Sequence, residues 1–108
     1  MSESGHTELT PAELQAKLAN GAVLLVDVRE ADEFAAEHIA GAINRPLSSF
    51  QPSLLPDAGG KLVVLQCAGG KRSGMALEKC AAAQAAIETH LAGGIGAWKA
   101  AGLPVVSG

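Results

Sequence analysis

The chain has 108 residues, of which 48% are hydrophobic, and it carries a formal net charge of −3 with a pI near 5.5. A chain of this length is long enough for one domain with its own core. The eight Lys and Arg residues are mostly scattered, whereas phosphate recognition needs clustered cations. Nucleic acid is therefore excluded as the main partner.

No apolar run approaches the roughly 20 residues that a membrane helix requires. The polar start MSESGHTE has neither the basic nor the apolar region of a signal peptide. We therefore expect a cytoplasmic chain without a membrane segment. The two cysteines, Cys67 and Cys80, form neither a CxxC pair nor a Cys/His cluster, so we expect free thiols and no metal site.

A helix is predicted to begin at the sequence TPAE, residues 10–13. Thr10 can cap the helix, proline suits the first helical position, and Glu13 completes a capping box. An Asn-Gly pair at 20–21 then ends it. The apolar run at 22–26 has strand length without alternation, which favours a parallel strand covered on both faces.

Helices and strands alternate along the rest of the chain. We expect a short helix at 30–37, a strand at 42–45, a loosely helical stretch at 47–55, a strand at 62–65, a helix at 72–86, a strand at 87–91 and a short helix through Trp98. This alternation argues for a three-layer α/β domain with a mostly parallel sheet. In such sheets, sites form outside the carboxyl ends of the strands.

The most informative stretch is QCAGGKRSG, residues 66–74, which follows an apolar strand. A strand, a glycine loop and a helix starting near Arg72 aim several backbone N–H groups at one point, which makes an anion cradle. These amides, with the cations of Lys71 and Arg72, favour the thiolate of Cys67. We therefore expect a solvent-accessible nucleophile with a lowered pKa. The glycine pair 69–70 fits, because backbone this tight needs positive φ angles.

An inert core thiol is the ordinary alternative for a cysteine after a buried strand, but it explains neither the glycine pair nor the adjacent cations. Cys80 is the contrast. It lies on one helical stripe with Ala76 and Ala83 and is predicted to pack in the core. Eight helical residues beyond Arg72 place it about 12 Å along the axis, too far for a local disulfide with Cys67.

Three blocks of the chain stand out together: VDVREADEFAAEHIAGAINRP (26–46), CAGGKRS (67–73) and LAGGIGAWKAAGLPV (91–105). In this order they resemble the sequence blocks of single-domain bacterial sulfurtransferases of the rhodanese-like family. The resemblance implies a three-layer α/β/α domain with a mostly parallel five-stranded sheet. It implies that this domain covers residues 7–106 and follows a flexible N-terminal tail at residues 1–6.

The resemblance also implies a thiosulfate sulfurtransferase that works through a persulfide cycle. Cys67 would take the outer sulfur of thiosulfate or of another persulfide donor. It would pass that sulfur to cyanide, to a small thiol such as glutathione, or to a dithiol protein, in ping-pong covalent catalysis. No metal or organic cofactor takes part. The residues implied to bind the donor are Ala68, Gly69, Gly70, Lys71, Arg72 and Ser73.

Other residues of these blocks are implied to be structural. In the first block, the residues implied to brace the fold are Asp27, Arg29, Glu33 and His38. A paired structural histidine is the more ordinary explanation for His38 than a catalytic role. In the third block, Trp98 and the glycine pair 93–94 are interpreted as core and turn.

Two other functions stay open at this point. Cysteine phosphatases and arsenate-handling proteins also use an anion loop from Cys to Arg, but with one residue more than the four found here, and often with a histidine where this chain has Gln66. One residue fewer removes up to about 3.5 Å of chain from the rim. A binding module or persulfide carrier of the same fold is the second alternative, since fold does not fix function.

Overall fold

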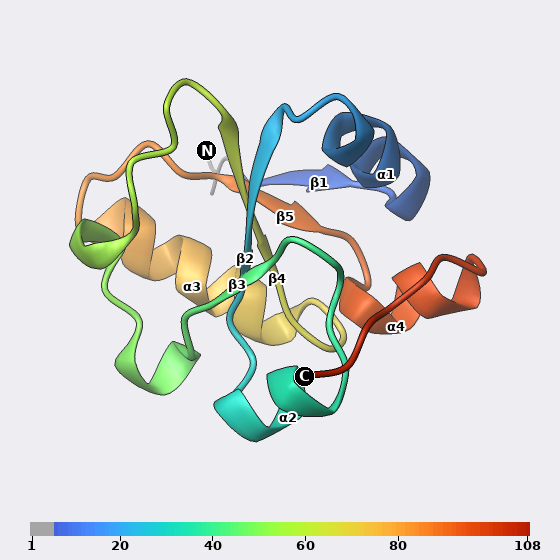
Figure 1. Ribbon diagram of the computed structural model, residues 1–108. Coiled ribbons are helices and arrows are strands. Elements are labelled where there is room, and N and C mark those ends of the chain that lie inside the picture. The colour runs from blue at the N-terminus through green and yellow to red at the C-terminus, as the bar shows by residue number, and fades with distance from the viewer. Residues whose placement is uncertain (1–5) are drawn as a thin grey trace.

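The computed structural model describes residues 6–108 as one five-stranded parallel sheet with helices on both sides (Figure 1). The strand order is β1-β5-β4-β2-β3. The strands are β1 (Thr7–Leu9), β2 (Val23–Asp27), β3 (Ile43–Asn44), β4 (Leu62–Gln66) and β5 (Thr89–Leu91). The helices are α1 (Pro11–Ala19), α2 (Ala31–Ala36), α3 (Lys71–Ala82) and α4 (Gly94–Ala100), with 3₁₀ turns η1 (Leu47–Ser49) and η2 (Pro52–Leu54).

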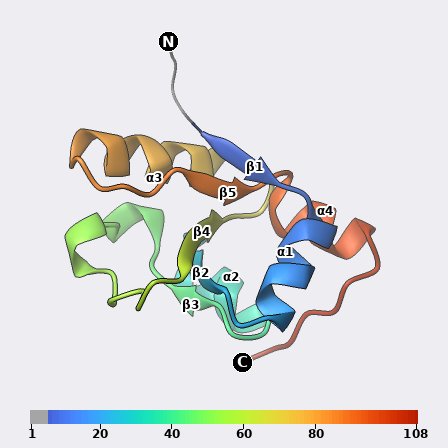
Figure 2. The same cartoon turned by 90° about the horizontal axis from the view of Figure 1, so that it is seen from above.

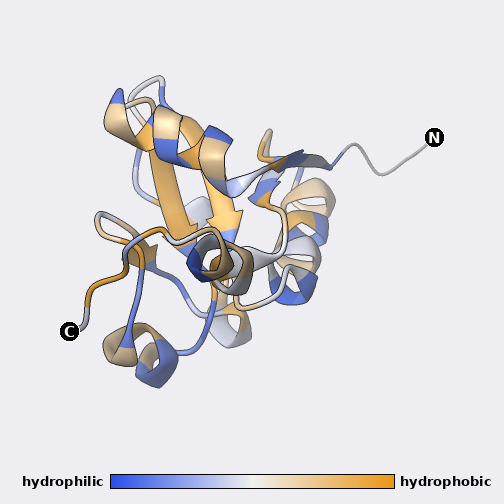
Figure 3. Ribbon diagram, turned by 90° about the vertical axis from the view of Figure 1, so that its right-hand side faces the viewer, coloured by the Kyte–Doolittle hydropathy of each residue, from blue (hydrophilic) through white to orange (hydrophobic). Residues whose placement is uncertain are grey.

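The sheet divides the interior into two hydrophobic cores. In β2, Val23 and Leu25 pack in the core shared with α1 and α4, whereas Leu24 and Val26 face the core shared with α3. Figures 1 and 2 show α3 and the η turns on one side of the sheet and α1 and α4 on the other. Because both faces are covered, the long strands are continuous hydrophobic runs, orange in Figure 3. The predicted three-layer α/β/α fold is confirmed.

The start of α1 follows the sequence prediction closely. The Thr10 hydroxyl accepts a hydrogen bond from the Glu13 N–H at 3.1 Å, and the Glu13 carboxylate accepts one from the Thr10 N–H at 2.9 Å. This capping box is set by residues three apart, so it needs no tertiary contact to form. The strands expected at 22–26, 42–45 and 62–65 likewise lie within one residue of their observed bounds.

Strand β1 was not predicted. The sequence indicated four strands by residue range, and the fifth strand implied by the family resemblance had no assigned position. It pairs in parallel with β5 at the edge of the sheet, with Glu8 opposite His90. A three-residue strand is too short to show a hydrophobic period, so only its pairing partner defines it. The predicted tail at residues 1–6 lies, apart from His6, outside the described residues.

The helix predicted over 72–86 is wrong at its carboxyl end, because α3 stops at Ala82. Gln84 has a φ of +58°, and the Ala85 N–H donates to the Cys80 carbonyl at 2.8 Å, which closes the helix with a left-handed turn. The alanine-rich sequence favours further helix. The chain turns there so that residues 83–88 can bring β5 beside β4, and this tertiary pairing overrides local propensity.

Among residues 6–108, no helix combines the length and the apolar composition needed to cross a bilayer. The longest of them, α3, has 12 residues.

The first turn of α4 supports the loop that follows β4. The Ile95 N–H donates to the Cys67 carbonyl at 2.8 Å, and the Gly96 N–H donates to the Ala68 carbonyl at 3.0 Å. Gly94 has a φ of +60°, and a Cβ there would lie 2.3 Å from the Cys67 carbonyl oxygen. The second residue of the glycine pair therefore lets two backbones touch, in addition to making the predicted turn.

Gly94→Ala is expected to destabilise the protein by roughly 1–3 kcal/mol more than Gly102→Ala, because a Cβ at Gly94 overpacks against backbone. Gly102 is the matched control, since its φ is +78° and nothing lies within 4 Å of an added Cβ. Gly102→Ala should therefore lose only the cost of placing a side chain in the left-handed conformation, about 1–2 kcal/mol. The free energy of unfolding from urea titration measures both, and equal losses would show that the close approach to the loop contributes nothing.

Candidate active site

Cys67 lies immediately after the carboxyl end of β4, on the sheet face that packs against α3. It is 1% exposed, so the expectation of a solvent-accessible thiol is wrong for the structure at rest. The next two residues, Ala68 and Gly69, are exposed. The thiol therefore lies in the core beside α3 rather than at an open mouth.

The loop and α3 place hydrogen-bonding groups around the Cys67 sulfur. The Gly70 N–H donates to Sγ at 3.0 Å, and Sγ lies 3.5 Å from the Ser73 hydroxyl oxygen. Gly70 caps α3 with a φ of +105°, a left-handed conformation that favours glycine. Gly69 is not in that region and has open space around a Cβ, so the conformational argument made for both glycines holds for Gly70 alone.

The pKa of the Cys67 thiol lies below its ordinary value as a balance of opposed effects. Burial is the largest single influence and raises the pKa. Hydrogen bonding by the Ser73 hydroxyl and by the backbone N–H groups of Ser73, Gly70 and Gly69 lowers it, and together these groups outweigh burial. Cys80, which is fully buried as predicted, has no such donors, so burial alone raises its pKa.

Arg72 is held by Glu33 instead of reaching freely over the sulfur. Its two terminal nitrogens donate to the two carboxylate oxygens at 2.7 and 3.0 Å, and this contact ties α3 to α2. The Arg72 hydrogen bonds lower the pKa of Glu33 to about 2 and raise that of Arg72, with the charge of Cys67 adding to the latter. Glu33 is thus a neighbour of the loop and more than a brace of the fold. Lys71 is exposed at the rim.

The remaining polar residues of the first sequence block (26–46) make contacts around α2 and the residues that flank it. The Arg29 guanidinium donates to the buried Asp27 carboxylate at 2.8 Å and to the Glu37 carbonyl at 2.6 Å. The His38 Nδ1 atom lies 2.8 Å from the Phe34 carbonyl oxygen, and the two rings are stacked. These contacts are what bracing residues make.

A series of polar side chains that leads from Cys67 through Ser73 to His90 and Glu8 was not predicted from the sequence. The Ser73 hydroxyl oxygen lies 2.8 Å from His90 Nδ1, and His90 Nε2 lies 3.4 Å from a Glu8 carboxylate oxygen. His90 is 6% exposed, and burial lowers its pKa, an effect that Glu8 opposes and the neighbouring His6 reinforces. The one signal for His90 in the sequence was its place in a predicted strand near its carboxyl end.

Gln66 supports the loop from within the sheet. It is fully buried, and its side-chain amide donates to the Cys67 carbonyl at 2.9 Å. That carbonyl therefore accepts two hydrogen bonds, one from Gln66 and one from Ile95. Both hold the backbone of Cys67 in place without touching the sulfur.

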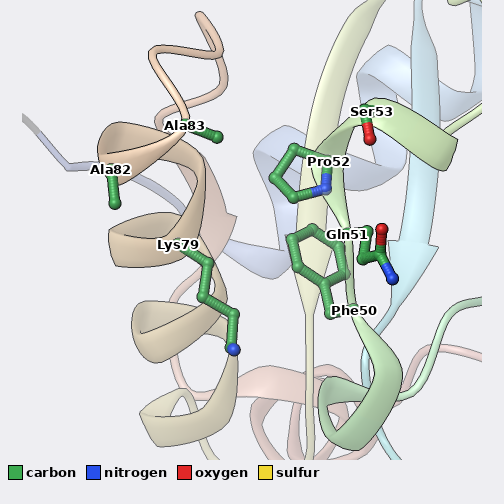
Figure 4. Close-up of a pocket in the computed structure, with 7 residues that line it drawn as sticks. All are labelled: Phe50, Gln51, Pro52, Ser53, Lys79, Ala82 and Ala83. Carbon is green, nitrogen blue, oxygen red and sulfur yellow. The ribbon is translucent and has the colours of Figure 1, made fainter.

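A cavity of about 430 Å³ lies apart from the loop, between α3 and the η turns. Phe50, Pro52 and Lys79 line it (Figure 4), and none of its lining residues belongs to 66–74. No three His, Cys, Asp or Glu side chains within residues 6–108 gather in a group that could hold a metal ion. Within residues 6–108, the polar groups around Cys67 therefore remain the candidate active site.

Comparison with known proteins identifies the family to which this fold belongs. The family model described as "Rhodanese-like domain" matches residues 10–101. An uncharacterized protein, slr1261, from Synechocystis is 48% identical over 98% of this chain. The chain spans 60% of that relative's length.

Solved structures share the same fold. A rhodanese-related protein from Thermoplasma volcanium has a TM-score of 0.79 and 31% identity, covering 94% of this chain and 98% of that one. A thiosulfate sulfurtransferase from Pseudomonas aeruginosa has a TM-score of 0.82 and 27% identity, covering 95% of this chain and 20% of that one. A protein from Rhodopseudomonas palustris described as a possible tyrosine phosphatase has a TM-score of 0.78 and 29% identity, covering 94% and 85%. By the family match and this shared fold, the chain belongs to the rhodanese-like domain family.

Proposed function

We propose that this chain is a sulfurtransferase that carries a sulfane sulfur on Cys67. The observation that supports this most directly is the placement of the Cys67 sulfur at the end of β4, 3.0 Å from the Gly70 N–H and 3.5 Å from the Ser73 hydroxyl. These groups stabilise an anionic sulfur without any metal or organic cofactor. A thiol that only packs in a hydrophobic core, as Cys80 does, lacks such hydrogen-bond donors.

In the first half-reaction, the Cys67 thiolate attacks the outer sulfur of thiosulfate. A sulfur–sulfur bond forms to Sγ, the sulfur–sulfur bond of thiosulfate breaks, and sulfite leaves with its electron pair. In the second half-reaction, an acceptor thiolate or cyanide attacks the outer sulfur, and Cys67 leaves as the thiolate. Between the two steps, the outer persulfide sulfur carries the negative charge.

The residues around Cys67 must shift for this chemistry, because Cys67 is 1% exposed at rest. Ala68 and Gly69, which follow it, are exposed, and nothing lies within 4 Å of a Cβ placed on Gly69. The space beside Gly69 is therefore open to a shift of the loop at that residue. The carbonyls of Cys67 and Ala68 are held by hydrogen bonds from α4, so we expect Gly69 rather than Ala68 to move.

We propose a small sulfane donor and a thiol acceptor, either a small thiol or a dithiol protein, as the partners. A reducing compartment such as the cytoplasm supplies such acceptors and keeps both cysteines as thiols. Cys80 stays outside the cycle, because it is fully buried and has a raised pKa.

Phosphatase chemistry is the second candidate, favoured by the Rhodopseudomonas palustris neighbour. In this chain, the loop has four residues between Cys67 and Arg72, and both terminal nitrogens of the arginine are bound to Glu33. An arginine so paired is not free to hold the equatorial oxygens of a phosphoryl group. We therefore favour the transfer of a single sulfur atom.

Incubation of the purified chain with thiosulfate is expected to add one sulfur atom to Cys67, lost again on reduction, and to release sulfite. Intact and peptide mass spectrometry measures it. Cys67→Ala should abolish both the adduct and turnover. Cys80→Ala is the matched control, because Cys80 is buried in the same core, and it should keep both. An unchanged mass, together with hydrolysis of p-nitrophenyl phosphate, would instead favour the phosphatase.

Glu33→Gln is expected to lower the KM for thiosulfate by about threefold or more, because it frees the Arg72 charge for an anionic donor. Since the pKa of Glu33 is about 2, the carboxylate is ionised across the neutral range, and the effect should not depend on pH above about 4.5. Arg72→Ala should raise the KM for thiosulfate by about tenfold, because it leaves the Glu33 carboxylate without its counter-charge near the loop. It should change the KM for a neutral organic trisulfide little.

Glu37→Gln is the control for this comparison, because it removes the same charge beside α2 from a residue paired with Lys99 instead of Arg72. Steady-state kinetics with both donors gives the KM values of the wild type and of the three variants. Equal changes in KM for the charged and the neutral donor would argue against a role of the Arg72 charge in donor binding.

A further inference from the structure

We infer that His90 is a positioning residue for the Cys67 thiolate and that it accepts, through the Ser73 hydroxyl, the proton that the thiol loses. The inference deepens the proposed sulfur transfer and rests on it for its biological role. Formation of the thiolate is nevertheless measurable without any sulfur donor.

Four side chains from four parts of the fold make one continuous line. Cys67 Sγ lies 3.5 Å from Ser73 Oγ, Ser73 Oγ lies 2.8 Å from His90 Nδ1, and His90 Nε2 lies 3.4 Å from a Glu8 carboxylate oxygen. Cys67 follows β4, Ser73 is in α3, His90 is in β5 and Glu8 is in β1. The line runs from the buried sulfur to an exposed carboxylate at the edge of the sheet.

The partners of His90 fix which ring nitrogen carries the hydrogen. A carboxylate only accepts, so the Nε2 atom that faces Glu8 carries the hydrogen and Nδ1 has a free lone pair toward Ser73. The lowered pKa of His90 keeps the ring neutral near pH 7, in the form that can accept a proton.

Ser73 has a single hydroxyl hydrogen and two nearby acceptors. The Gly70 carbonyl lies at 3.2 Å and His90 Nδ1 at 2.8 Å, so the shorter contact favours donation to His90. The oxygen lone pairs then face Cys67, whose thiol donates to Ser73. Every hydrogen in the line points away from the sulfur, which is the arrangement needed before a proton leaves it.

The proton step keeps charge and electrons balanced. The Cys67 S–H bond breaks as a new O–H bond forms on Ser73, while the original Ser73 O–H bond breaks as an N–H bond forms on His90. The electron pair stays on sulfur, and nothing is oxidised. The products are a thiolate, an unchanged serine hydroxyl that now donates to the sulfur, and an imidazolium.

The charged and titratable groups that influence His90 directly are Glu8 and His6, with Cys67 next in the line beyond Ser73. Glu8 on β1 stabilises the imidazolium, His6 just before β1 opposes it with its ring 5.9 Å away, and Cys67 stands behind Ser73. The thiolate and the imidazolium therefore titrate as a coupled pair. A purely structural His90 would tie β5 to α3 and leave the titration of Cys67 unchanged.

The test is the pH dependence of iodoacetamide alkylation at Cys67 in the full chain, resolved from Cys80 by peptide mass spectrometry. His90→Asn keeps a polar atom near the Nδ1 position but cannot take up a proton. It is expected to raise the midpoint of the alkylation profile by at least about one pH unit. The alkylation rate near pH 7 should fall by about tenfold.

Glu8→Gln supplies a variant that is safe for folding, because Glu8 is an exposed side chain on an edge strand. It should move the midpoint in the same direction by a smaller amount, since the imidazolium loses its counter-charge. The Ser73→Ala and His90→Asn changes together should shift the profile no further than Ser73→Ala alone, as expected for groups that act in series. His38→Asn is the control histidine, whose ring contacts Phe34, and it should leave the profile unchanged.

An unshifted midpoint in His90→Asn, with the thermal unfolding curve retained, would overturn the inference. If His90→Asn does not fold, an unshifted Glu8→Gln profile would overturn it instead. Sulfur transfer is scored separately. A shifted profile in a chain that transfers no sulfur would refute the proposed function and keep the relay, and transfer with an unshifted profile would do the reverse.

Discussion

The carbonyl oxygen of Cys67 accepts hydrogen bonds from the Ile95 N–H at 2.8 Å and from the Gln66 amide at 2.9 Å, and the site depends on this anchoring. It fixes the backbone of Cys67 between β4 and the first turn of α4. With that backbone fixed, the chain can turn at Gly70 and direct an N–H group back at the sulfur. The close approach of α4 is possible because Gly94 has no Cβ.

Two opposed effects, burial and hydrogen bonding, then set the pKa of the Cys67 thiol. Burial alone would make it as inert as Cys80, which lies in the same core without hydrogen-bond donors. The loop amides and the Ser73 hydroxyl reverse the outcome and lower the pKa. The difference in pKa between the two thiols of this protein is therefore a matter of local hydrogen bonding rather than of exposure.

Two acid–base pairs lie on either side of the loop and give it different properties. Glu33 binds Arg72 at the outer side and offsets the positive charge that an anionic donor would meet. Glu8 faces His90 at the inner side, where it favours a positive ring behind Ser73. In the proposed reaction, the first pair would influence the choice of donor, and the second would influence the charge of the Cys67 sulfur.

Elements with local signals could be predicted from the amino-acid sequence. The Thr10 capping box, the buried runs of β2 and β4, and the Cys67 loop with its following helix need only neighbouring residues to be recognised. Features that depend on strand pairing or helix docking could not be predicted: the short edge strand β1, the early end of α3, and the contacts of Glu33 with Arg72 and of Glu8 with His90. Strand pairing and helix docking bring together residues up to 82 positions apart, as Glu8 and His90 are, and no local pattern records such a meeting. The burial of Cys67 also depends on the tertiary structure, because the core around it is built from β2, β4 and α3.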